Sequence, residues 1–151
     1  MARVADVAST AVEQRVSLIT LGVADVGRSA AFYQKLGWVV GMDVQETVFF
    51  QAGGLIVTLW GRDKLADDCG VIDSGGWGGI ALAHNVGTRA DVDRIIDGAR
   101  DAGARISREP AETFYGGYAG VFLDLDGHAW EVACNPGFEL RDDGTVALPS
   151  R

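Results

Sequence analysis

The sequence is poor in the residues that build disulfide, metal and nucleic-acid sites. Among 151 residues it has two cysteines and two histidines, and 13 lysines and arginines stand against 21 aspartates and glutamates. Cys69 and Cys134 have neither CxxC nor zinc-finger spacing, so we expect a reduced, cytoplasmic setting. A formal net charge of −8 argues against binding to a phosphate backbone, which requires clustered basic side chains.

Long apolar runs are also missing. No stretch approaches the roughly 20 apolar residues that a membrane-spanning helix needs. The first residues, MARVADVASTAVEQR, do not combine a basic region with a continuous apolar one, so we expect no secretion signal. We interpret residues 1–14 as a tail or a short helix. The partners that these absences exclude are nucleic acid and membrane.

The chain does contain one pattern of secondary structure that occurs twice. Each copy begins with an aliphatic strand, continues with a helix that ends at a glycine (Gly37 or Gly103), and finishes with three strands. The helices are expected at 25–36 and 89–102. The expected strands are 16–24, 38–43, 46–52 and 55–60 in the first copy, and 79–86, 104–107, 118–124 and 128–134 in the second.

Positions of the first copy correspond to positions of the second at offsets that increase along the chain, so the second copy contains small insertions. Gly37 corresponds to Gly103, and Thr58 corresponds to Glu131. A single β-α-β-β-β unit cannot bury both faces of its sheet, so two copies should pack together. We therefore predict an α+β fold of two pseudo-repeated βαβββ modules. The expected boundaries are 15–61 and 79–137 for the modules, 62–78 for the linker and 138–151 for a C-terminal tail that is either loose or a small hairpin.

Two motifs carry a resemblance to a known family. They are LGVADVGRSAAFYQKLGW at residues 21–38 and FLDLDGHAWEVACNP at residues 122–136. The first resembles the opening motif of the vicinal oxygen chelate superfamily and the second its closing motif; this superfamily includes glyoxalase I, extradiol dioxygenases and bleomycin-resistance proteins. The resemblance implies mixed sheets that curl around a concave cavity. It also implies four metal-facing positions, which fall at Leu18, Thr58, Gly79 and Glu131.

Only one of these four positions holds a residue type that suits a divalent metal. Leucine and glycine offer no side-chain donor, and a threonine hydroxyl is a poor ligand, which leaves Glu131 alone. His84 and His128 have the wrong strand parity to share a face with Gly79 or Glu131, so we interpret them as turn or surface residues. We therefore expect no metal and no cofactor.

Strand alternation predicts what lines the cavity instead of metal ligands. Small residues form its floor, Trp60 forms a wall, and rings from the linker and from the TFYGGY loop (113–118) are expected to overhang it; these rings alternatively cap the core or form a dimer interface. The expected ligand-binding residues are Leu18, Thr20, Ile56, Thr58, Trp60, Trp77, Gly79, Ala81, Phe114, Tyr115, Tyr118 and Glu131.

Glu131 has three possible roles in such a pocket, because a buried carboxylate is costly unless it is neutralised or paired. It can act as a general base, anchor a cationic or hydroxylic ligand, or pair internally with an arginine or with Thr58. A lone base has no group that stabilises the developing negative charge. This consideration favours the anchor over the base.

Two functions follow from the resemblance and the altered positions. The first is a metal-free, glyoxalase/bleomycin-resistance-like protein that sequesters a small organic ligand, an aromatic or cationic metabolite or drug, as in antibiotic resistance. The alternative is a lyase, isomerase or dioxygenase that uses Glu131 as its catalytic base at a non-standard metal site. A third possibility is a module whose cavity its own side chains fill. The resemblance also implies a homodimer, with paired cavities or with modules exchanged through the 62–78 linker.

Overall fold

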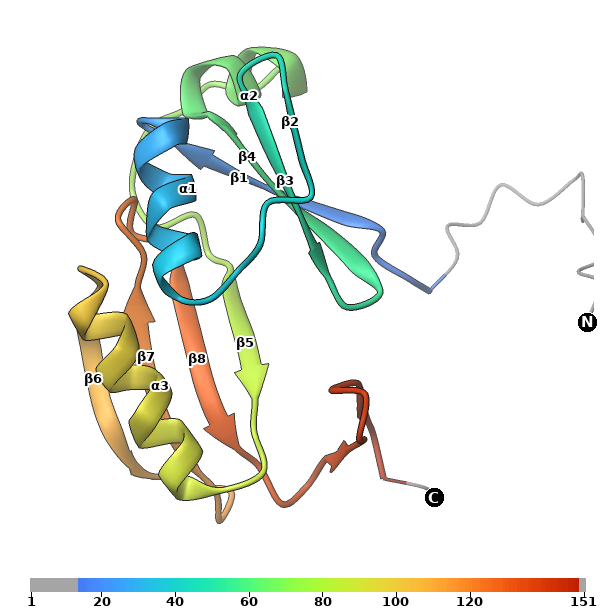
Figure 1. Cartoon of the computed structure of the whole chain (residues 1–151), viewed down its shortest axis with the longest axis vertical. Helices are drawn as coiled ribbons and strands as arrows, with labels where there is room; N and C mark the ends of the chain where they lie inside the picture. Colours follow the sequence, from blue (N-terminus) through green and yellow to red (C-terminus); the bar gives the residue numbers. More distant parts are fainter. Residues whose placement is uncertain (1–13, 150–151) are drawn as a thin grey trace, which may run out of the picture.

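The chain folds into two βαβββ modules that lie one above the other along the longest axis of the molecule (Figure 1). A computed structural model describes residues 14–149. The predicted α+β fold is confirmed. The elements are β1 (Leu18–Val23), α1 (Val26–Lys35), β2 (Met42–Val44), β3 (Thr47–Ala52), β4 (Leu55–Gly61), α2 (Arg62–Cys69), β5 (Ala81–Asn85), α3 (Arg89–Asp101), β6 (Arg105–Glu112), β7 (Tyr118–Leu123), β8 (Ala129–Cys134), β9 (Glu139–Leu140) and β10 (Val146–Ala147).

The two modules have the same sheet topology, as the repeat predicts. Sheet A has the strand order β1-β4-β3-β2, and sheet B has the order β5-β8-β7-β6. The first pair in each sheet is parallel and the other pairs are antiparallel. The register places Thr20 opposite Thr58 and Ala83 opposite Glu131. None of the helices in residues 14–149 is long and apolar enough to cross a membrane.

The helices begin and end where their capping residues stand. The Asp25 carboxylate accepts a hydrogen bond from the Arg28 amide (2.9 Å) at the start of α1, and the Thr88 hydroxyl accepts one from the Asp91 amide (3.1 Å) at the start of α3. Gly37 and Gly103 follow the two helices with φ values of 98° and 106°, which favour glycine. The expected helix ranges are therefore confirmed to within a residue.

Two strands differ from their expected ranges by more than two residues at one end. β2 begins at Met42 instead of residue 38, and Trp38 packs against the ring of Tyr33 at 5.3 Å. β6 continues to Glu112 instead of ending near 107, because register shifts on both sides of Arg108 let this edge strand pass Pro110.

The segments outside the modules also take defined forms. The linker begins with the short helix α2, and β9 and β10 form an antiparallel hairpin around Gly144 in the predicted C-terminal tail. The expected N-terminal tail or helix lies almost wholly in residues 1–13, outside the described residues.

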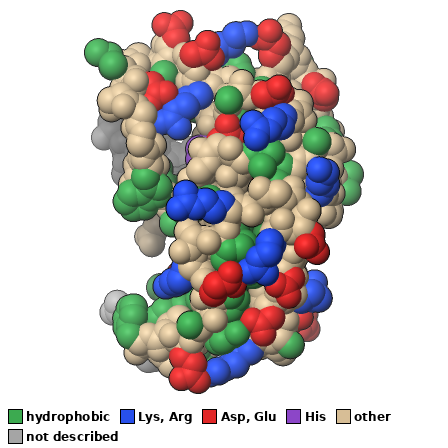
Figure 2. Space-filling view, turned by 90° about the vertical axis from the view of Figure 1, so that its left-hand side faces the viewer, with side chains coloured by type: hydrophobic (Ala, Val, Ile, Leu, Met, Phe, Trp, Pro, Cys, Tyr) green, Lys and Arg blue, Asp and Glu red, His purple; other side chains and the backbone are tan. Residues whose placement is uncertain are grey.

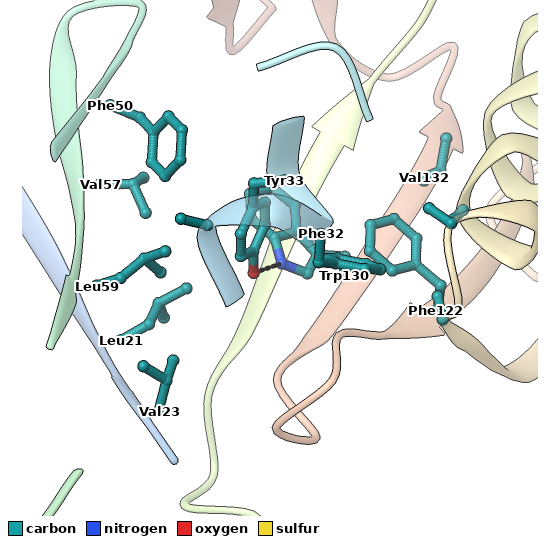
Figure 3. Packing of buried hydrophobic residues seen from close by; sticks show 14 of the residues in the cluster. Leu21, Val23, Phe32, Tyr33, Phe50, Val57, Leu59, Phe122, Trp130 and Val132 are labelled. Carbon is teal, nitrogen blue, oxygen red and sulfur yellow. Dashed lines mark hydrogen bonds between the residues drawn. The ribbon is translucent and has the colours of Figure 1, made fainter. Parts of the chain in front are cut away.

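Helix α1 lies between the two sheets and joins them into one hydrophobic core (Figure 3). Phe32 and Tyr33 are each 1% exposed. The Phe32 ring packs on Phe122 of sheet B (6.5 Å between centroids), while the Tyr33 ring packs on Trp130 of sheet B (6.1 Å) and on Phe50 of sheet A (6.0 Å). Because apolar burial is the main favourable term in folding, this shared core holds the modules together.

A buried hydrogen-bond network centres on Tyr33. Its hydroxyl donates to the Asp124 carboxylate at 2.6 Å and accepts from Trp130 Nε1 at 3.2 Å. Asp124, 5% exposed, also accepts the backbone amides of Asp126 (2.9 Å) and His128 (2.8 Å). Burial and the adjacent Asp124 charge raise the pKa of Tyr33 well above its ordinary range. A residue of the opening motif is thus bonded to one of the closing motif.

The turn between β7 and β8 adds two further contacts between the modules. The Ala24 amide donates to the Asp126 carboxylate at 2.8 Å, and His128 Nε2 donates to the Gly22 carbonyl at 2.8 Å. The Ala24 amide and the Gly22 carbonyl both lie at the end of β1, so the closing motif is fixed against the first strand of the chain.

Replacing Tyr33 by phenylalanine is expected to lower the free energy of unfolding by about 1–3 kcal/mol, because buried Asp124 loses a donor and Trp130 loses its acceptor. Urea denaturation measures the change. Tyr115→Phe is the matched control, since the Tyr115 hydroxyl makes no hydrogen bond among residues 14–149. Equal stability of the two variants would contradict this role.

The same hydroxyl predicts a dependence on alkaline pH. Because folding raises the pKa of Tyr33, its contribution to stability is fully present below the ordinary tyrosine pKa of 10.0 and is lost as pH rises above that value. We expect the stability difference between wild type and Tyr33→Phe to shrink from about pH 10 upward. A constant difference across that range would be inconsistent with the network.

Candidate functional site

Each sheet buries one face in the shared core and turns the other away from it. In β4, Val57 and Leu59 point into the core, as Figure 3 shows, while Thr58 lies on the opposite face. In β8, Trp130 and Val132 point into the core. We call the face of each sheet that is turned away from the core its open face. Alternation assigns Leu18, Thr20, Ile56, Thr58 and Trp60 to the open face of sheet A, and Ala81, Ala83 and Glu131 to that of sheet B.

The open face of sheet A contains a buried hydroxyl group without a partner. Thr58 is 4% exposed, and its Oγ1 makes no hydrogen bond to any residue in the described range 14–149. Leu18 lies on the same face of the neighbouring strand β1, opposite Ile56, and is 41% exposed. A buried polar group without a partner is uncommon and calls for an explanation, such as a bound ligand.

The linker closes one end of this open face. Arg62 lies over Gly22, where an added Cβ would come within 3.1 Å of the Arg62 side chain. Arg62 is held there by Asp73, with Nε–Oδ2 and Nη2–Oδ1 distances of 2.6 and 3.0 Å. The guanidinium, together with the Gly75 amide, lowers the pKa of Asp73 to about 2. The pair is therefore charged on both sides at neutral pH.

Glu131 is neither unpaired nor fully buried on the open face of sheet B. Its Oε2 lies 3.3 Å from Nη2 of Arg108 on β6, and the two side chains are 38% and 52% exposed. Internal pairing with an arginine, one of the three roles considered for this residue, is therefore observed. Oε1 makes no hydrogen bond within the described part of the chain. Ala83 and Ala81 beside it are small and exposed.

The aromatic residues expected around a pocket are spread over different parts of the surface. Trp77 is 66% exposed and donates to the Ile80 carbonyl at 3.1 Å. Phe114 is fully exposed at the tip of the β6–β7 hairpin, with the Tyr115 ring against its edge at 5.2 Å. The three rings therefore belong to two separate segments, the linker and the tip of the β6–β7 hairpin.

Tyr118 faces α3 and not the open face of sheet B. Its hydroxyl donates to Asp93 at 2.6 Å, and the Arg89 guanidinium lies 5.3 Å from its ring centroid. The interaction with Asp93 is the main cause of a raised pKa of Tyr118. Tyr118 pairs with Cys134 on β8. Cys134 lies on the same face of the sheet as Val132, which points into the core.

The residues present do not fit the metal that the family's four positions imply. Gly79 precedes β5 and has a φ of +81°, a conformation that other residues rarely adopt. Leu18 and Gly79 offer no side-chain donor, and Glu131 already contacts Arg108. In residues 14–149 no three His, Cys, Asp or Glu side chains are grouped so that they could hold a metal ion.

The two histidines lie where strand parity places them. His84 is opposite Val132 on the helix-bearing face of sheet B, so it does not share a face with Glu131. His128 lies in the β7–β8 turn, with Nε2 bonded to the Gly22 carbonyl. The prediction that neither histidine joins Glu131 on its face is confirmed.

Sequence reasoning missed two contacts of this region, that of Arg108 with Glu131 and that of Asp124 with Tyr33. Arg108 follows a register shift in β6, so simple alternation does not assign its face. Asp124 lies two residues after Phe122 on the buried side of the closing motif, and this parity was the available signal that it needs a partner in the core.

The fold agrees with comparisons to known proteins. Residues 15–132 match the model of the Glyoxalase/Bleomycin resistance protein/Dioxygenase superfamily. The chain belongs to this superfamily. No curated protein matches the chain.

Solved structures give the same fold. A glyoxalase-related enzyme from Fulvimarina pelagi is 35% identical over 91% of this chain and 99% of its own, with a TM-score of 0.85. A hypothetical protein from S. aureus is 26% identical over 82% of this chain and 95% of its own, with a TM-score of 0.71. A lactoylglutathione lyase from Agrobacterium tumefaciens is 18% identical over 80% and 92%, with a TM-score of 0.62, which shows the fold alone.

Asp124 and Glu131 of the closing motif are expected to differ in their effect on stability. Glu131→Gln should change the free energy of unfolding by less than about 1 kcal/mol, because its pair with Arg108 is exposed. Asp124→Asn should cost about 1–3 kcal/mol, because a buried charge-assisted hydrogen bond is weakened. Urea denaturation of both variants tests this, and a larger loss for Glu131→Gln would contradict it.

Proposed function

We propose that the protein binds and sequesters a small aromatic molecule that carries an ammonium or hydroxyl group, and that it does so without a metal or other cofactor. The ligand occupies the open faces of the sheets. The site combines the open face of sheet A of one protomer with the open face of sheet B of a second protomer in a homodimer. A drug or metabolite held in this way is kept from its target, which is a route to antibiotic resistance.

The unpartnered hydroxyl of Thr58 is the observation that carries this proposal. It lies on the face that the superfamily uses for ligands, at a position where metal enzymes of the superfamily place a metal ligand. Because leaving a buried polar group unbonded costs about 1–3 kcal/mol, a bound molecule that hydrogen-bonds to Oγ1 recovers that free energy.

Glu131 supplies the complementary charge. Its Oε1 is available to a donor on the ligand, and the long, partly exposed contact with Arg108 leaves the carboxylate accessible. Ala81 and Ala83 leave room beside it for a ring, and Trp60 on the facing sheet A offers an aromatic surface for stacking. The arrangement favours a ligand that pairs a ring with a hydrogen-bond donor.

Exposed apolar side chains support a second copy of the chain as the partner. Leu18 is 41% exposed, Met42 is 50% and Val44 is 43%, and the register places all three on the open face of sheet A. Large apolar groups exposed together on a soluble protein usually mark an interaction surface. A dimer that brings sheet A of one protomer to sheet B of the other covers both open faces.

Calorimetry with tyramine, which joins a phenol to an ammonium group, tests the proposal. We expect saturable binding that Glu131→Gln weakens about tenfold and Thr58→Val weakens severalfold. The first variant removes the negative charge that pairs with the ammonium group, and the second removes the hydroxyl. 4-Ethylphenol, which lacks the ammonium group, should bind equally to wild type and Glu131→Gln. Glu139→Gln is the matched control, since Glu139 also faces an arginine, Arg141, but in the C-terminal hairpin.

The proposal fails if a panel of aromatic amines and phenols gives no binding below about 1 mM, or if neither Glu131→Gln nor Thr58→Val alters any affinity.

The similarity to a glyoxalase-related enzyme supports a second candidate, a lyase, isomerase or dioxygenase with Glu131 as the base. The two candidates differ in what Glu131→Gln removes. A catalytic base predicts retained substrate affinity with lost turnover, whereas a ligand anchor predicts lost affinity. Stoichiometric zinc, nickel, iron or manganese in the purified protein, lost in Glu131→Ala, would favour the enzyme.

A further inference from the structure

A cavity of about 370 Å³ lies between the modules, on the helix-bearing face of sheet B. The end of α1 and the following segment form one side, and α3 forms another. Its floor is buried, with Trp130 7%, Phe122 3% and Val132 0% exposed. The volume falls in the range of sites for small organic molecules.

The cavity is separate from the site of the proposed function. Val132 and His84 line it, and they pair with each other across β8 and β5. Glu131 and Ala83, the adjacent pair in this register, point to the opposite side of the sheet. A ligand in this cavity would therefore not contact the open face of sheet B.

Aromatic rings form the floor and one wall of the cavity. Phe122 and Trp130 are stacked, with 5° between their planes and 6.0 Å between centroids. The Trp38 ring stands at 89° to Trp130, with centroids 5.7 Å apart. Two surfaces at a right angle match the face and the edge of one planar ring.

The charged residues at the cavity are basic, although the whole chain has a net charge of −8. Lys35, in the last turn of α1, takes part in none of the ion pairs among residues 14–149. Arg94 has one exposed pair, with Asp91 at 3.1 Å. On this side of the molecule basic and acidic side chains are interspersed and form no continuous acidic surface (Figure 2).

Glycine and histidine complete the lining. Gly98 lies inside α3, where glycine costs about 1 kcal/mol relative to alanine, and an added Cβ would meet no atom within 4 Å. This helix position therefore leaves space open instead of filling it. His84 is exposed as a whole residue, but desolvation of its ring lowers the pKa, so the imidazole is neutral at pH 7 and can share a hydrogen bond.

From this combination we infer that the cavity is a second ligand site, which takes a small planar aromatic carboxylate. The ring lies against Trp130 and Trp38, and the carboxylate faces Lys35 and Arg94. Because residues of both modules line the cavity, a bound molecule contacts both modules at once.

Binding of 2-naphthoate tests this inference. Calorimetry measures the affinity, and the indole N–H signals of the tryptophans in NMR spectra locate the site. We expect saturable binding that shifts the Trp130 and Trp38 signals more than those of Trp60 and Trp77. The oppositely charged 2-naphthylmethylammonium should bind at least about fivefold more weakly. No saturation by about 5 mM 2-naphthoate, or equal affinity for the two probes, would overturn the inference.

Four variants locate the site. The double variant, which combines Lys35→Gln and Arg94→Gln, should weaken 2-naphthoate binding at least about fivefold. The control Arg28→Gln, at the other end of α1, should leave the affinity unchanged. Gly98→Leu should abolish binding by filling the space, without loss of thermal stability, because leucine is a better helix former than glycine. Glu131→Gln should not change the affinity. Unchanged binding in the charge and Gly98 variants, or a loss in Glu131→Gln, would contradict the assignment.

Discussion

The hydrogen bond from Tyr33 to Asp124 fixes the two modules against each other inside their shared hydrophobic core. It joins α1, in the module of sheet A, to the β7–β8 turn, in the module of sheet B. The indole of Trp130 donates a second hydrogen bond to the Tyr33 hydroxyl. Both residues belong to the motifs that define the family resemblance. The closing motif, which resembles a ligand-binding motif, therefore also stabilises the fold. The Asp124 carboxylate accepts two backbone amides of the turn that precedes β8, the strand that carries Glu131.

This packing decides which surfaces are left for a ligand. Because α1 lies between the sheets, the sheet faces that carry Val57, Leu59 and Trp130 are buried in the core. Thr58 and Glu131 are turned away from that core, on different sheets. In the function that we propose, a single chain contributes two half-sites, one with the Thr58 hydroxyl and one with the Glu131 carboxylate, and a second copy of the chain joins them.

The sequence predicted the repeat, both helices and most strands, because aliphatic alternation, capping residues and helix-ending glycines are local signals. It did not predict the turn at Gln45 and Glu46, where two non-glycine residues have positive φ values of 48° and 68°. Nor did it assign Arg108 to Glu131, because a register shift in β6 changes the face of that residue. The position of α1 between the sheets is a tertiary property, so strand parity alone could not show that the open faces turn away from a common core.

The central claim is that one ligand site is shared by Thr58 of one protomer and Glu131 of the other. The most direct test is to co-express Thr58→Val and Glu131→Gln chains with different tags, purify the heterodimer and titrate it with tyramine. A shared site predicts one intact site per heterodimer, so wild-type affinity returns at half the wild-type stoichiometry. If each site lies within one chain, both sites of the heterodimer stay damaged and no wild-type affinity returns, which would contradict the claim.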